Sequence, residues 1–79
     1  MKSLCMINVE AGMVDKVLHI LKKKRSVSKD IMIVAGRADL CVILNGKINE
    51  INKIVTDLKK IKEIVSTETL IEVEVDLGW

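Results

Sequence analysis

Residues 31–44 read IMIVAGRADLCVIL. Two apolar runs rich in β-branched residues stand on either side of Gly36-Arg37, and glycine beside a polar residue is typical of a chain reversal. The spacing predicts a tight β-hairpin with strands over 29–35 and 38–44. Because this hairpin lies in the middle of a 79-residue chain, the segments before and after it decide the fold.

The segment before the hairpin is predicted to form a strand and then a helix, and the segment after it a helix and then a strand. Residues 4–9 form a short apolar run that predicts a strand. After Met13 the apolar residues Val14, Val17, Leu18 and Leu21 fall at i, i+3, i+4 and i+7, which predicts a helix whose last turn holds the cations Lys22–Arg25. After the hairpin, a second helix is expected over 48–61 and a fourth strand over 64–75.

The predicted order βαββαβ has short connections throughout, so we expect one domain over residues 1–79. Right-handed crossovers then give an α+β, ferredoxin-like fold. Its four-stranded antiparallel sheet has the order 4-1-3-2, and both helices cover one face.

The aliphatic content exceeds what one small fold can hide. Ile, Val and Leu make up 29 of 79 residues, and the first three predicted strands are apolar on both faces. Antiparallel sheets with one wet face alternate apolar and polar residues instead. Since two helices cover a single face, we expect a second copy of the chain to cover the other, giving a homodimer.

The composition argues against several classes of function. Cys5 and Cys41 lie in apolar runs, and the chain has one histidine, His19, so we expect no metal site, no cofactor and no enzyme. A net charge of +2 with 1% aromatic residues does not favour nucleic acid. No membrane span or signal peptide is apparent, so we expect a cytoplasmic protein, and the Lys- and Ile-rich, Pro-free composition hints at a thermophile.

Polar groups converge at one end of the predicted sheet, where the strand over 4–9 ends, the hairpin turns and the last strand begins. Gly36, the Arg37 cation, the Asp39 carboxylate and the hydroxyls within residues 66–69 meet there. A zwitterionic amino acid needs donors for its carboxylate and an acceptor for its ammonium group. Turn glycines and aspartates are also common for purely structural reasons, and the residues alone favour that interpretation.

Three segments together resemble the effector-binding (RAM) domain of the Lrp/AsnC feast/famine regulators. Residues 7–12, INVEAG, look like the family's first-strand exit. Residues 33–40, IVAGRADL, look like its V-x-G-x-x-D hairpin. Residues 64–69, IVSTET, look like its V-x-x-T-x-T entry to the last strand.

The resemblance implies a face-to-face dimer, often assembled into octamers, with a small-molecule site, usually for amino acids, at subunit contacts. By position, the ligand-binding residues would be Gly36, Arg37, Ala38, Asp39, Thr67 and Thr69. Because the chain begins directly at the first strand, it resembles stand-alone members without a helix-turn-helix. Such a module would act on transcription without touching DNA or a membrane, by changing its oligomeric state or by joining full-length regulators. An ACT-like regulatory or adaptor subunit of a metabolic enzyme is the alternative, with Gly12 as its only candidate glycine.

Three other features have a plain and a functional interpretation. The cations Lys22–Arg25 fit a solvated helix end better than a phosphate site. Cys5 and Cys41 fit small buried hydrophobes. Trp79 is either a frayed terminus or an anchor between dimers.

Overall fold

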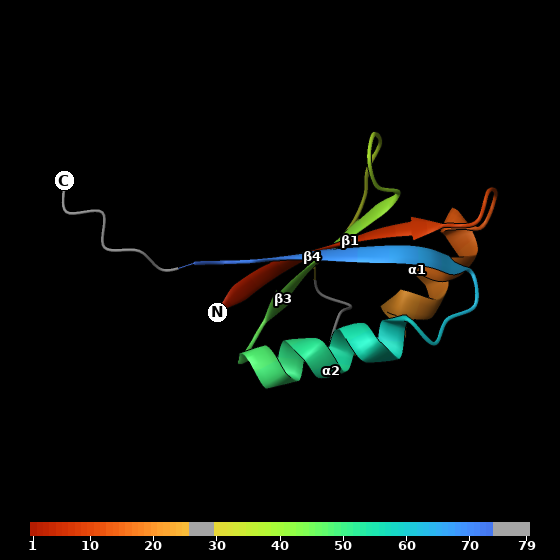
Figure 1. The fold of residues 1–79 in the computed structure, drawn as a ribbon. Coiled ribbons are helices and arrows are strands. Elements are labelled where there is room, and N and C mark those ends of the chain that lie inside the picture. Colours follow the sequence, from red (N-terminus) through yellow and green to blue (C-terminus); the bar gives the residue numbers. More distant parts are fainter. Residues whose placement is uncertain (26–29, 74–79) are drawn as a thin grey trace.

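The computed structural model describes residues 1–25 and 30–73. Its elements are β1 (Lys2–Val9), α1 (Val14–Lys22), β2 (Ile31–Ile33), β3 (Leu40–Asn45), α2 (Ile48–Leu58) and β4 (Ile64–Ile71). The strands form one antiparallel sheet in the order β2-β3-β1-β4, and both helices lie on one side of it (Figure 1). The predicted ferredoxin-like fold and strand order are confirmed. Trp79 lies outside the described residues.

Both helices end earlier than the sequence predicts. The helix α1 stops at Lys22, not Arg25, and the N–H of Lys23 turns back to the carbonyl of Ile20 at 3.2 Å. Residues 22–25 add no apolar side chain that the core could bury, so packing does not support a further turn. The helix α2 stops at Leu58, and the chain then turns through Lys59 and Lys60.

The prediction of a tight hairpin at Gly36-Arg37 was wrong. The strand β2 ends at Ile33 and β3 begins at Leu40, so six residues connect them. The N–H of Val34 still donates to the carbonyl of Asp39 at 3.0 Å, which holds the base of the loop together. Gly36 has a φ of +114°, a conformation that favours glycine. In Figure 1 this loop rises on the side of the sheet away from the helices.

The core lies between the sheet and the helices. Its central members are fully buried and come from every element except β2 and β4: Cys5, Ile7, Val17, Leu21, Leu40, Val42, Leu44, Ile51 and Leu58. On β1 and β3 they occupy alternate positions, as expected for one face of a sheet. The two apolar helix stripes fill the space opposite. This layer supplies the hydrophobic stabilisation of the single chain.

The face opposite the helices, here called the open face, is also largely apolar. Cross-strand pairing aligns two rows on it: Ile43, Leu4 and Leu70 in one, and Met32, Cys41, Met6 and Glu68 in the next. Met32 is 45% exposed and Leu70 49% exposed. The predicted placement of apolar residues on both faces is confirmed, whereas the second copy expected to cover this face stays a prediction.

Candidate functional site

Asp39 is fixed at the junction of the hairpin loop and β1. Its carboxylate oxygen Oδ2 accepts a hydrogen bond from the N–H of Val9 at 2.9 Å, and its own N–H donates to the carbonyl of Ile7 at 3.0 Å. Pairing between β1 and β3 ends at Ile7 and Leu40. Beyond that point the Asp39 side chain supplies the hydrogen-bond acceptor for the N–H of Val9. Each carboxylate oxygen can accept more than one hydrogen bond, so Asp39 retains acceptor capacity for a ligand.

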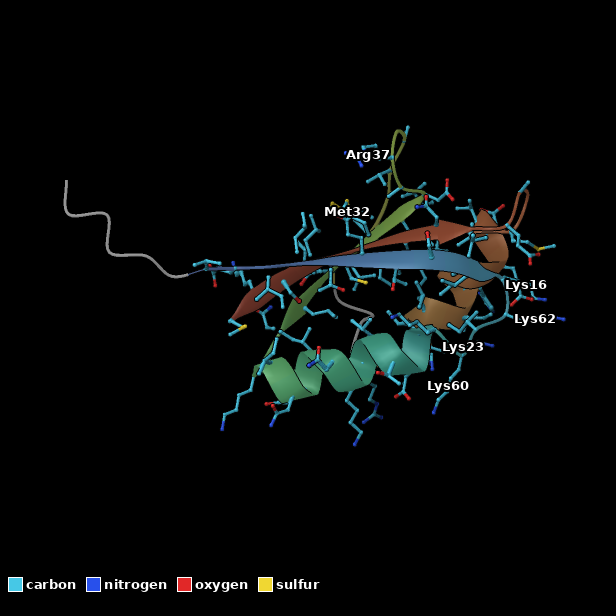
Figure 2. The ribbon with its side chains drawn as sticks, viewed as in Figure 1. Lys16, Lys23, Met32, Arg37, Lys60 and Lys62 are labelled. Atoms are coloured by element: carbon cyan, nitrogen blue, oxygen red, sulfur yellow. The ribbon has the colours of Figure 1, made fainter. Side chains whose placement is uncertain are left out.

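The other hairpin residues differ in exposure. Gly36 and Arg37 are exposed, whereas Ala38 is buried at 5% exposure. Figure 2 shows Arg37 on the loop, on the side of the sheet away from the helices. The Arg37 side chain is therefore accessible to solvent or to another molecule, whereas Ala38 packs the loop against the rest of the chain.

Thr67 and Thr69 lie on the helix-covered face of the edge strand β4. They pair with Ile7 and Cys5 respectively, and both are half-buried. The Thr67 hydroxyl oxygen is buried without a hydrogen-bond partner. Burial raises the pKa of the Cys5 thiol, and a side-chain hydrogen bond with Thr69 partly opposes that rise.

The two halves of the predicted site flank the same strand from opposite sides. Asp39 contacts β1 at Ile7 and Val9 from the β3 side, and Thr67 pairs with Ile7 from the β4 side. Because β1 runs between them, one chain does not close a pocket that contains both. A shared ligand would need a further surface from outside the chain.

A charged corner closes the same end of the fold. The Nζ atom of Lys16 on α1 donates to Oε2 of Glu63 at 2.8 Å, and the N–H of Glu10 donates to the Glu63 carbonyl at 2.9 Å. Glu63 is 5% exposed. The hydrogen bond from Lys16 is the main cause that lowers the pKa of the Glu63 carboxyl. This corner holds α1 against the entry to β4, a role the sequence analysis missed because the two residues are far apart in the chain.

A shallow, open groove of about 410 Å³ lies at the other end of the open face. Its apolar lining includes Leu4, Ile43 and Leu70, and Lys2 and Glu72 also line it. This groove was not predicted from the sequence. The sequence feature that points to it is Leu70, an apolar residue at a position where the alternation of the last strand would place a polar one.

Within the described ranges 1–25 and 30–73, no group of three or more His, Cys, Asp or Glu side chains is placed to hold a metal ion. In that same part of the chain, no helix is long and apolar enough to cross a membrane. His19, the single histidine, is exposed on α1.

Solved structures share this architecture. A hypothetical protein from Pyrococcus horikoshii aligns with a TM-score of 0.80 and 24% identity over 94% of this chain and 90% of its own. AsnC from E. coli aligns with a TM-score of 0.83 and 20% identity over 96% of this chain, which spans 52% of AsnC. An AsnC family transcriptional regulator from Agrobacterium tumefaciens aligns with a TM-score of 0.75 and 10% identity over 94% of this chain and 50% of its own.

This chain shares the fold of AsnC. It corresponds to about half the length of AsnC and to nearly all of the Pyrococcus protein. At these identities the likeness concerns the fold. No family model matches the sequence, and no curated protein matches it.

Proposed function

We propose that the chain is an effector-binding domain of the Lrp/AsnC family. The observation that carries this proposal is the pair of structural alignments, in which the chain matches about half of AsnC and almost the whole of a small Pyrococcus protein. The three sequence segments that resemble the family support it. An ACT-like subunit would share the strand and helix order, but the solved structures described above favour the first proposal.

Its ligand is a small molecule, and an amino acid fits the available groups. The remaining acceptor capacity of Asp39 suits an ammonium group, and the exposed Arg37 guanidinium suits a carboxylate. Thr67 and Thr69 are included on the resemblance alone, since both lie on the helix-covered face of β4 and the Thr67 hydroxyl is buried. Because β1 separates these groups within one chain, the site is proposed at a contact between subunits.

The proposed mechanism is linkage between ligand binding and assembly. A ligand held between subunits stabilises whichever assembly completes its pocket, by its difference in affinity for the two states. The partners are further copies of the chain, in a homodimer or a larger ring such as an octamer, and full-length Lrp/AsnC regulators. The domain would alter regulation through these partners, without catalysis and without contacting DNA itself.

A thermal-shift screen of the amino acids, with light scattering on the same samples, tests the proposal. A ligand at a hundred times its Kd adds about 2.7 kcal/mol to the free energy of unfolding. We expect at least one amino acid to raise the Tm and change the mass. If none moves either quantity, the effector proposal is wrong and a structural adaptor becomes the better account.

A further inference from the structure

The strand β4 ends at Ile71, although the sequence predicts a strand as far as Val75, which lies outside the described residues. The last backbone bond to the sheet is that of Glu72, whose N–H donates to the carbonyl of Lys2, the first residue of β1, at 2.9 Å. Within the described residues, no strand lies beside the chain beyond this point. The predicted strand pattern therefore continues past the end of the chain's own sheet.

The C-terminal stretch has the pattern of an extended segment that buries one side. Residues 73–79 read VEVDLGW, in which apolar residues alternate with charged residues or glycine and end on Trp79, the single aromatic residue. Val73, which the structure describes, is 76% exposed, so the core of its own chain does not cover it. Because no glycine or proline stands between Glu72 and Gly78, the sequence does not favour a tight reversal back onto the same sheet.

The groove on the open face lies beside the point where the chain leaves the sheet. Leu4, Ile43 and Leu70 line it, and its volume of about 410 Å³ is large enough for a few side chains. Lys2 and Glu72 add one charge of each sign. Apolar contact, and not net charge, therefore selects what the groove binds.

We propose that residues 74–79 of a second copy of the chain occupy this groove, with Trp79 as the anchoring side chain. Buried aromatic side chains contribute a large share of the binding energy at interfaces. Packed sheets lie about 10 Å apart, and seven extended residues span at most about 25 Å, so residues 73–79 can reach the facing sheet. The proposal rests on the homodimer of the proposed function and adds a contact that each copy makes with the other.

Trp79 reports on its own burial, because the chain has one tryptophan and no tyrosine. The test follows tryptophan emission of the full chain over a dilution series, without added amino acid, and measures the mass of the same samples by sedimentation. We expect short-wavelength emission in the dimer and a shift to the longer wavelength of a water-exposed indole as the dimer dissociates. Both transitions should occur at the same concentration, and Trp79→Ala should raise the Kd of the dimer about tenfold or more.

Two substitutions on the open face distinguish the groove from the rest of the interface. Leu70→Ala shortens a side chain that lines the groove, and Met32→Ala shortens an exposed side chain on β2 outside it. At a concentration where both variants sediment as dimers, Leu70→Ala should shift the emission to longer wavelength and Met32→Ala should leave it unchanged.

Four results would each overturn the proposal: a wild-type chain that is monomeric throughout, emission that does not change on dissociation, a Leu70→Ala variant that emits like the wild type, or equal shifts in the two variants. Emission that stays at short wavelength on dilution would place Trp79 against its own chain. A dimer in which Trp79 stays exposed would overturn the proposal and leave the assembly standing. The thermal-shift screen tests the effector function separately.

Discussion

The Asp39 carboxylate accepts the N–H of Val9 at 2.9 Å, which joins the hairpin loop to the last residue of β1. Two residues thirty positions apart therefore share one bond at the end of the sheet where the candidate site lies. The bond gives Asp39 a structural role whether or not a ligand binds. This structural role and the proposed ligand role can be separated by substitutions that either keep or remove the oxygen acceptor.

Asp39→Ala should lower the free energy of unfolding by about 1–2 kcal/mol, because the half-buried N–H of Val9 loses a charged acceptor. Asp39→Asn keeps an oxygen acceptor and should lose less. Urea denaturation gives both values, with Asp30→Asn, which changes an exposed aspartate, as the control. If Asp39→Asn is as stable as the wild type yet loses the response to amino acids, Asp39 also contacts the ligand. Equal stability of Asp39→Ala and wild type would contradict the structural role.

The Lys16–Glu63 pair predicts a dependence of stability on pH. The hydrogen bond from Lys16 holds the pKa of Glu63 below its usual range, so the folded chain binds this proton less readily than the unfolded chain. The contribution is complete above the ordinary glutamate pKa of about 4.3 and is lost as the pH falls through the lowered pKa.

Chemical denaturation between pH 7 and pH 3 measures this contribution. In Glu63→Gln the acid-dependent loss of stability should be shallower than in the wild type. Asp57→Asn, which removes the exposed pair with Lys60 at 3.6 Å, should leave the slope nearly unchanged because exposed pairs contribute little. Identical slopes for wild type and Glu63→Gln would refute the assignment.

The open face predicts self-association. Leu70 is 49% exposed on it, so Leu70→Glu should cost the single chain little while placing a charge in a surface that a second copy would bury. Sedimentation at micromolar concentration should show a dimer for the wild type and monomer for the variant. Ile48→Glu is the control, since Ile48 is 40% exposed at the start of α2 in the helix layer. A wild-type chain that sediments as a folded monomer would contradict the prediction.

The helix layer predicts a large core effect. Leu58 is fully buried at the end of α2, so Leu58→Ala should lower the free energy of unfolding by about 2–5 kcal/mol through lost contacts and the cavity left behind. That is a large fraction of the stability of a small domain. Thermal melts followed by circular dichroism measure the loss. An unchanged Tm would mean that α2 does not pack as described.

Much of the fold follows from local pattern. The two apolar, β-branched runs within residues 31–44 predict paired strands, and the spacing of apolar residues in the two helical segments predicts their inner faces. The ends were less predictable. The tail of α1 at Lys23–Arg25 has good helix propensity but nothing to pack against. The connection around Gly36-Arg37 is wider than a two-residue turn, and Asp39 at its base bonds to β1 at Ile7 and Val9 as well as to Val34. Helix and strand ends depend on tertiary packing, which propensity does not contain.

The candidate site, like the fold, was predictable from the sequence only in part. The sequence by itself determined which polar residues gather at one end of the sheet, because the antiparallel order places strand ends together. Only the tertiary structure decided that β1 separates Asp39 from Thr67 and Thr69, that Glu63 is bound by Lys16, and that Met6, Cys41 and Met32 form a row. Those relationships depend on strand register, and a shift of one residue would move each side chain to the opposite face.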